Sequence, residues 1–210
     1  MECRSRMDEK MMKKRIAVIL VVLMVCGISE IVPAEEAIDL VEDIPTVQAF
    51  SDEAVKAEDI DRIINAGVNS PSAMNKQPWH FSVVTDRSVI EKVAGEPNDK
   101  NTPVIRARAS DAPLLIIISC NEGAELDAGL ATQAMSIEAQ LLGYGTKIFI
   151  SPVHTINDEA QQGLRNTLGI PEEQKAAAVL AIGTEDVYAD ILSTATVRYS
   201  QEELVTYILP

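Results

Sequence analysis

One segment carries most of the chemical information in this sequence, and it reads Ser70-Pro71-Ser72-Ala73-Met74-Asn75-Lys76-Gln77-Pro78-Trp79-His80-Phe81. It places the only tryptophan of the chain beside hydroxyl, amide and ammonium groups. Its two prolines restrict the backbone, and the hydroxyls and amides offer donors and acceptors that suit the edge of a heterocycle. By composition alone, the same segment also fits a polar connection between a helix and a strand, with the Trp packed into the core.

The residues around this segment predict one α+β domain in which helices outnumber strands. Apolar residues that recur every three or four positions indicate helices. Alternating apolar and polar residues, or short continuous apolar runs, indicate strands. Residues 95–108 are polar and read as a loop, and residues 35–43 as a short helix or loose arm. The predicted helices are 51–66, 88–94, 127–142, 157–168 and 201–208, and the predicted strands are 80–84, 114–119, 147–150 and 176–182.

The charge of the chain excludes one large class of partner. The 210 residues carry 18 Lys and Arg against 32 Asp and Glu, a formal net charge of -14. Nucleic-acid binding needs clustered bases for the phosphates, and with 4% aromatic residues a stacking platform for single-stranded bases is not expected either. With 47% hydrophobic residues, the composition is typical of a globular protein.

The first 34 residues have the organisation of a secretory signal peptide. The basic cluster 13–15 precedes the apolar run 16–28, and Val32-Pro33-Ala34 offers a small-residue cleavage site. We therefore expect residues 1–34 to be removed and residues 35–210 to form an exported domain, periplasmic or extracytoplasmic, without a membrane attachment. Residues 1–34 hold six bases and four acids, so the remainder keeps 12 bases and 28 acids, a net charge of -16.

Three alternatives remain open at the N-terminus. An uncleaved anchor is possible in principle, but the apolar run of 13 residues is shorter than the ~20 that span a bilayer. A lipoprotein would use Cys26, although Val25 is a poor residue to precede it. Translation can also begin at Met11 or Met12. After cleavage only Cys120 is left, so no internal disulfide is expected.

The familiar catalytic motifs are absent. The two histidines, His80 and His154, lie far apart and outside any metal-binding spacing. There is no G-x-G-x-x-G, no P-loop and no G-x-S-x-G in the sequence. Because Cys120 ends an apolar run, it is read as a buried structural thiol. No metal site is expected, and no side chain is assigned as a catalytic acid, base or nucleophile.

The segment 70–81 resembles the signature of the nitroreductase family of FMN-dependent oxidoreductases, which runs roughly P-S-x-x-N-x-Q-P-W-x-F. The matching positions are Pro71, Ser72, Asn75, Gln77, Pro78, Trp79 and Phe81. Weaker similarities extend over most of the chain after residue 34. They cover the family's opening segment at 46–52, its D-A-P at 111–113, its long central helix at 127–145, its last strand region at 168–171 and 182–183, and its tail at 197–205.

The resemblance implies a nitroreductase-like α+β fold with a mostly antiparallel sheet flanked by helices, and an intertwined homodimer with FMN at its interface. It also implies reduction of the flavin by NAD(P)H and reoxidation by a nitroaromatic, a quinone or a similar acceptor. The cofactor-binding positions carried over by motif are Thr46, Gln48, Pro71, Ser72, Ala73, Asn75, Gln77, Arg108 and Arg198.

Two further positions, Arg108 and His154, each allow two interpretations. Arg108 matches a position that is often basic in the family, where a cation would stabilise the negative charge that reduction places near flavin N1 and O2. The alternative is a solvated charge in a loop. His154 stands where family members often have glycines, and it is interpreted either as a substitute in the flavin site or as a histidine in a surface loop.

The sequence also departs from the family. The opening segment usually supplies two bases for the FMN phosphate, and here Ile44 and Gln48 occupy those places, although Thr46 keeps a hydroxyl and Arg198 a base. Losing two charge-assisted bonds of ~1.5–3 kcal/mol each predicts FMN binding weaker by ~10²-fold or more. The alternatives are a degenerate flavin-binding or flavin-free protein on this fold, acting as an exported binding module, and an acidic module unrelated to flavins.

Overall fold

The computed structural model describes residues 46–95, 108–186 and 199–209. Contacts divide the chain into two units, Met1–Asp39 and Leu40–Pro210, and every described residue belongs to the second unit. The predicted signal segment 1–34, the substituted base position Ile44, the predicted C-terminal base Arg198 and most of the predicted loop 95–108 therefore lie outside the described residues.

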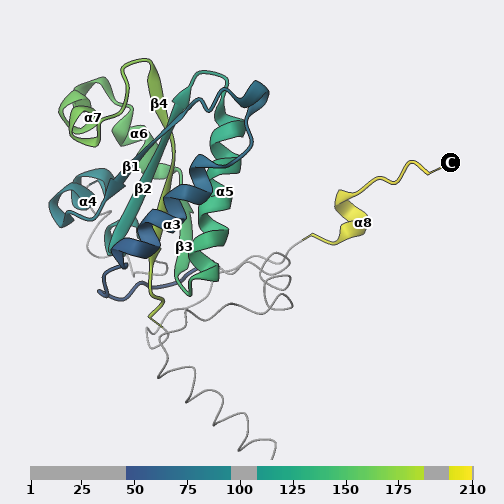
Figure 1. Ribbon diagram of the computed structural model, residues 1–210, viewed down its shortest axis with the longest axis horizontal. Coiled ribbons are helices and arrows are strands. Elements are labelled where there is room, and N and C mark those ends of the chain that lie inside the picture. The colour runs from purple at the N-terminus through teal and green to yellow at the C-terminus, as the bar shows by residue number, and fades with distance from the viewer. Residues whose placement is uncertain (1–45, 96–107, 187–198, 210) are drawn as a thin grey trace, which may run out of the picture. The chain divides into compact units, whose positions relative to one another are not determined.

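A four-stranded antiparallel sheet forms the centre of this unit (Figure 1). Its strands are β1 (Trp79–Val84), β2 (Leu114–Asn121), β3 (Gly145–Phe149) and β4 (Gln174–Gly183), in the order β1-β2-β4-β3. All four predicted strands are confirmed, with small shifts at their ends. The central strands β2 and β4 are the continuous apolar runs of the sequence, because both of their faces are covered.

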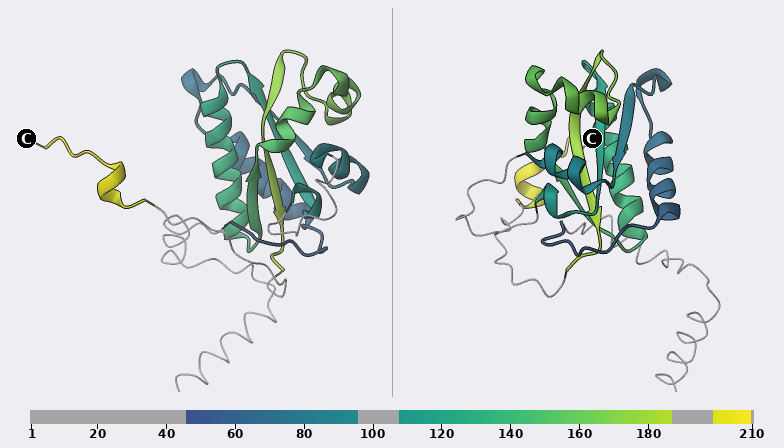
Figure 2. Two further views of the ribbon diagram at one scale, coloured as in Figure 1. Left: turned by 180° about the vertical axis from the view of Figure 1, so that it is seen from behind. Right: turned by 90° about the vertical axis from the view of Figure 1, so that its left-hand side faces the viewer.

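Helices cover the two faces of the sheet (Figure 2). On one face, α3 (Ala57–Val68) packs along α5 (Glu125–Leu141), and on the other lie α4 (Arg87–Ala94), α6 (Ser151–Ile156) and α7 (Gln162–Leu168). Short 3₁₀ turns occur at Ala73–Asn75, Ala109–Asp111 and Glu159–Gln161. Among the described residues, no helix is long and apolar enough to cross a membrane.

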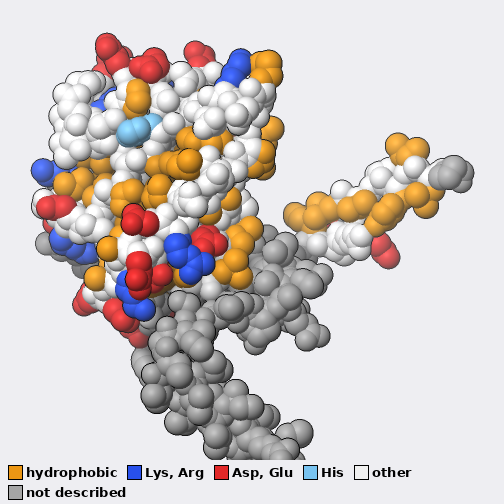
Figure 3. Space-filling model, viewed as in Figure 1, with side chains coloured by type: hydrophobic (Ala, Val, Ile, Leu, Met, Phe, Trp, Pro, Cys, Tyr) orange, Lys and Arg blue, Asp and Glu red, His pale blue; other side chains and the backbone are white. Residues whose placement is uncertain are grey.

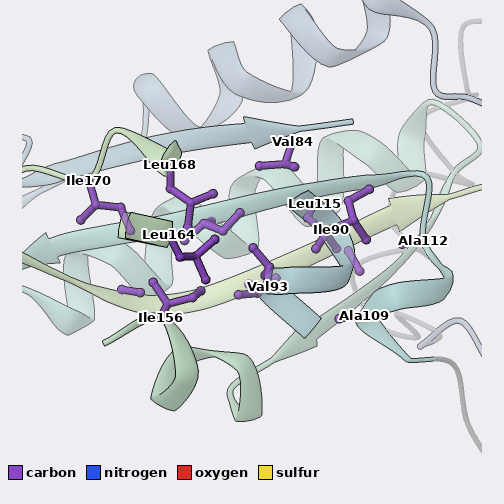
Figure 4. Close-up of a cluster of buried hydrophobic side chains, with 14 of the residues drawn as sticks. Val84, Ile90, Val93, Ala109, Ala112, Leu115, Ile156, Leu164, Leu168 and Ile170 are labelled. Atoms are coloured by element: carbon purple, nitrogen blue, oxygen red, sulfur yellow. The ribbon is translucent and has the colours of Figure 1, made fainter. Parts of the chain in front are cut away.

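Alternate residues of β2 divide the interior into two cores. Ile116 and its neighbours two positions away face α3 and α5, where they meet Ile63 and Met135. Leu115 and Ile117 face the other helices and pack with buried residues of α4, α6 and α7 (Figure 4). Each of these side chains is nearly or fully removed from water, which is worth ~1.5–3 kcal/mol for a side chain of this size.

The helix predicted over 51–66 begins later than expected, at Ala57. The cause is tertiary, since the chain before it is bound to the end of the sheet. Phe50 forms an isolated β-bridge with Glu185, and the N–H of Ser51 donates to the carbonyl of Thr184 at 2.9 Å. These bonds keep the backbone extended beyond the residue at which the sequence pattern first turns helical.

The helix predicted over 157–168 is also wrong in its first half. Asn157 terminates α6, and its side chain bonds both the N–H and the carbonyl of Ala176, at 2.9 Å each. The Asn157 side chain therefore bonds the backbone of β4 at Ala176 as a residue of a neighbouring strand would. Asp158 then accepts a bond from the N–H of Ala160 and starts the 3₁₀ turn that leads into α7.

The last predicted helix, 201–208, is shorter in the structure, where α8 spans Gln201–Leu204. Ser200 caps it, with its N–H donating to the Glu203 carboxylate at 2.8 Å. Val205 is extended, and the β-branched and aromatic residues that follow are weak helix formers. The hydroxyl of Ser200 donates to the same carboxylate at 2.9 Å, and because Glu203 accepts both bonds, its pKa lies below the usual value.

One close approach makes a glycine necessary at the end of β4. A Cβ added to Gly183 would lie 2.6 Å from Cδ of Pro113 and 3.0 Å from a ring carbon of Phe50. Both neighbours are rigid, so neither can move aside cheaply. We expect Gly183→Ala to lower the free energy of unfolding by ~1–3 kcal/mol, as overpacking does, measured by urea denaturation.

The matched control for this substitution is Gly163→Ala in α7, where an added Cβ meets nothing within 4 Å. There the change from Gly to Ala should raise stability by up to about 1 kcal/mol. Equal effects of the two substitutions would contradict the packing argument.

Candidate functional site

Residues 70–78 connect α3 to β1 and expose most of their surface to solvent. Met74 is 81% exposed. The carbonyl and amide of the Asn75 side chain form no hydrogen bond within the described structure, so both remain available to a ligand. Ser72 is half-buried and still has its hydroxyl proton to donate. We call residues 70–78 the polar loop.

The polar loop contains an unusual backbone. Met74, Asn75 and Gln77 have φ values of 53°, 53° and 49°, in the left-handed region that residues with a side chain rarely adopt. Such conformations cost ~1–3 kcal/mol each and persist only when the surroundings impose them. Strain of this kind concentrates at sites of function.

Local hydrogen bonds close the loop on itself. The Oγ of Ser72 accepts from the N–H of Gln77 at 2.9 Å, and the carbonyl of Ser72 accepts from the N–H of Asn75 at 3.0 Å. The N–H of Lys76 donates to the carbonyl of Ala73 at 3.2 Å. Ser72 is therefore the centre of the turn and not only a candidate ligand contact.

Hydrogen bonds attach the start, the middle and the end of the loop to the fold. At its start, Ser70 Oγ donates to the carbonyl of Ala66 at 3.1 Å. In its middle, the N–H of Ala73 donates to Oδ1 of Asp127, at the start of α5, at 3.2 Å. At its end, the carbonyl of Pro78 accepts from the N–H of Asn121 at 3.2 Å.

A buried amide supports the end of the loop. Nε2 of Gln174 lies 3.4 Å from the carbonyl of Pro78, and its Oε1 accepts from the hydroxyl of Ser119 at 2.9 Å. Ser119 is fully buried and Gln174 is 7% exposed. Polar groups this deep are retained when they bond one another, so the network holds the base of the loop in one position.

The aromatic pair that follows the loop is structural. The rings of Trp79 and Phe81 stack with centroids 6.1 Å apart and an interplanar angle of 20°. Both rings are half-buried on β1. Cys120 lies opposite Trp79 in the sheet. Burial raises the pKa of its thiol, and the negative charges of Glu125 and Asp127 raise it further. The prediction of a buried, unreactive Cys agrees with these surroundings.

The other predicted cofactor residues lie at the far end of the sheet. The segment that holds Thr46 and Gln48 is joined to β3 by the N–H of Val47, which donates to the carbonyl of Thr146 at 3.2 Å. Nε2 of Gln48 donates to the carbonyl of Thr46 at 2.8 Å, so its amide is engaged locally. Arg108 precedes β2 at this same end, and its N–H donates to the Asp111 carboxylate at 2.8 Å.

Within one chain, the predicted cofactor residues of the polar loop do not meet those at the far end of the sheet. Gln174, beside the polar loop, begins β4, and Gly183, in contact with the N-terminal segment, ends it. Ten residues of strand separate the two ends by roughly 30 Å. The first group is Pro71, Ser72, Ala73, Asn75 and Gln77, and the second is Thr46, Gln48 and Arg108.

The structure also identifies residues that motif reasoning did not single out. Asp127 and Gln174 both bond the polar loop, but the sequence assigned neither of them a role in the site, and their partners are distant in sequence. His154 is exposed on α6 and not in a loop. Among the described residues, no group of three or more His, Cys, Asp or Glu could hold a metal ion.

Solved structures with the same arrangement of elements establish the fold. A nitroreductase with bound FMN from Bacteroides fragilis superposes with a TM-score of 0.65 at 22% identity, covering 83% of this chain and 99% of that one. A nitroreductase with bound FMN from Desulfitobacterium hafniense gives a TM-score of 0.68 at 18% identity, covering 83% and 98%. At these identities the likeness concerns the fold: an α+β nitroreductase-like fold with helices flanking an antiparallel sheet.

Sequence comparison then gives the family. The model described as "Nitroreductase family" matches residues 45–184. A relative from Methanothermobacter thermautotrophicus, named for NADH dehydrogenase and NAD(P)H nitroreductase activity, is 30% identical over 155 residues, covering 69% of this chain and 76% of its own. A protein of the same name from Archaeoglobus fulgidus is 30% identical over 159 residues, covering 71% and 85%. The chain belongs to the nitroreductase family.

Proposed function

We propose that this protein is an FMN-dependent oxidoreductase that transfers electrons from NAD(P)H to a small acceptor such as a nitroaromatic or a quinone. The observation that carries the proposal is the polar loop, which is exposed, held in a strained shape and equipped with an unused amide at Asn75. The names of the relatives and the FMN bound in related structures point in the same direction.

The donor set suits this cofactor. Hydroxyl and amide groups of Ser72, Asn75 and Gln77 can bond the polar edge of an isoalloxazine. Arg108, in the group at the far end of the sheet, can offset negative charge on the cofactor. When bound, the flavin supplies the hydride and electron chemistry. The protein's contribution is to bind and orient it and to admit the donor and the acceptor.

The direct test is the visible absorbance of the purified protein, titrated with FMN and then with NADH or NADPH. We expect a bound-flavin spectrum, a rise in melting temperature with FMN, and oxidation of one nicotinamide donor. Asn75→Leu should weaken FMN binding about tenfold, since it removes a polar partner. Asn166→Leu, an exposed Asn on α7, is the matched control and should bind FMN as the unmodified chain does.

A second candidate is supported by a specific observation. The amide of Gln48 is turned to its own backbone, and position 44 is Ile, so neither supplies a charge to a phosphate. The alternative is therefore a flavin-binding or flavin-free protein on the same fold that acts as an exported binding module. An FMN-dependent rise in melting temperature without NAD(P)H oxidation would favour the flavin-binding form, and no response to FMN would favour the flavin-free one.

We also propose that the protein works as a homodimer. Leu126 and Leu130 lie one turn apart on α5, and both project into solvent, at 76% and 42% exposure. Apolar side chains also gather along residues 199–209 (Figure 3). The exposed ones there are Tyr199, Leu204, Val205, Tyr207, Ile208 and Leu209. Exposed apolar side chains grouped in this way are typical of an interface, and a second copy can cover both regions by symmetry.

A dimer would also complete the cofactor site. The polar loop and the group containing Arg108 lie at opposite ends of the sheet within one chain, too far apart to bind one FMN molecule together. An isologous pair places each patch of one chain against the partner, so that one end of each chain can meet the other end of its partner.

Mixing two defective variants tests this shared site. Asn75→Leu impairs one group and Arg108→Ala the other, so at an FMN concentration near the dissociation constant of the unmodified protein each homodimer should bind little FMN. Refolding them together should form mixed dimers that each hold one intact site, about a quarter of the flavin content of the unmodified protein if pairing is random. No recovery, in a mixture shown to contain mixed dimers, would place the whole site in one chain.

We propose, finally, that the protein is exported by residues 1–34. The support is the order of basic cluster, apolar run and small residues in the sequence, together with the family match, which begins only at residue 45. Expression of the full chain in a bacterium, followed by intact-mass measurement of the periplasmic fraction, should find a protein that begins at Glu35. A full-length mass in the cytoplasm would contradict export, and a lipid-modified mass would indicate attachment at Cys26.

A further inference from the structure

We propose that Asp127 is a positioning residue for the cofactor, acting through the polar loop and not by contact with the ligand. This inference rests on the proposed flavin function. Its basis is the bond from the N–H of Ala73 to Oδ1 of Asp127 at 3.2 Å. Within the described parts of the chain, this is the only side chain outside the loop that bonds residues 71–77.

The middle of the loop needs such an anchor. The bonds around Ser72 join loop residues to one another, so they define its shape but not its position on the fold. The bonds at Ser70 and Pro78 hold its two ends. Between these ends lie the left-handed residues Met74, Asn75 and Gln77, almost free of burial. A strained and exposed turn relaxes unless something rigid opposes the relaxation.

Asp127 provides a fixed reference because its helix is closely packed along one face. Ala128, its neighbour, is 1% exposed, and Met135 is fully buried against α3. A Cβ added to Gly67 of α3 would lie 2.8 Å from Sδ of Met135, which shows how closely the two helices approach. In the first turn of α5, the helix dipole also favours the negative charge of Asp127.

The same bond changes the role assigned to Ala73. Its N–H is already donated to Asp127, so it is not a free donor for a ligand. Ala73 therefore transmits the position of α5 to Asn75, two residues along the chain, whose unused amide is the group expected to meet the flavin.

Two substitutions at the same position separate hydrogen bonding from charge. Asp127→Ala removes the acceptor and should weaken FMN binding about tenfold, measured by fluorescence titration, while the melting temperature of the flavin-free protein stays close to that of the unmodified chain. Asp127→Asn keeps Oδ1 as an acceptor and should restore the affinity. Glu122→Ala, the loss of an exposed acid nearby, is the charge control and should leave FMN binding unchanged.

Ala73→Pro removes the donor from the other side of the bond. Ala73 is the first residue of its 3₁₀ turn, a position that accepts proline. Ser72 is extended, with ψ of 157°, as the residue before a proline should be. This variant should weaken FMN binding as Asp127→Ala does. The double variant should bind no more weakly than either single one, because all three lose the same bond.

The outcomes distinguish this inference from the proposed function. If the unmodified protein binds no FMN, both fail. If it binds FMN and Asp127→Ala binds equally well, the positioning role fails while the function stands. A role confined to stability would appear as a large fall in the melting temperature of flavin-free Asp127→Ala, with full affinity kept in Ala73→Pro, and this result would also overturn the inference.

Discussion

The burial of the two central strands on both faces is the constraint on which the rest of the structure depends. Because β2 and β4 are apolar at nearly every position, neither face of the sheet can be left to water. The chain must supply helices for both sides, and α3 with α5 covers one while α4, α6 and α7 cover the other. These two layers of helices hold the sheet in place, and the candidate site residues lie at its two ends.

The candidate site uses that rigidity at its two ends. At one end, the last residues of β2 and the first of β4 present Asn121 and Gln174, which hold the base of the polar loop. At the other end, Gly183 lets Pro113 and Phe50 approach closely, which brings the N-terminal segment against the sheet. A sheet covered by two helical layers thus offers two separated groups of polar residues, and neither group alone resembles a complete cofactor site.

Local patterns predicted most of the elements and missed those that depend on distant partners. The strands at 114–119 and 176–182 were recognisable because apolar runs require burial wherever they fold. The start of α3 and the break at Asn157 were not, since a bridge to Glu185 and a side-chain bond to Ala176 decide them. The motif at 71–81 predicted the cofactor loop. Asp127 begins the segment that resembles the family's central helix, but that resemblance did not indicate its bond to the loop, because the partner lies more than fifty residues away.

The sequence by itself determined the family, the strands of the core and the segment with the chemistry of a cofactor loop, since short-range periodicity and a specific run of residues carry that information. Only the tertiary structure decided that the loop is held in its middle by α5, that three of its residues are left-handed, and that the other predicted residues lie at the far end of the sheet. Strand direction and register set those distances, and they follow from packing the whole chain at once.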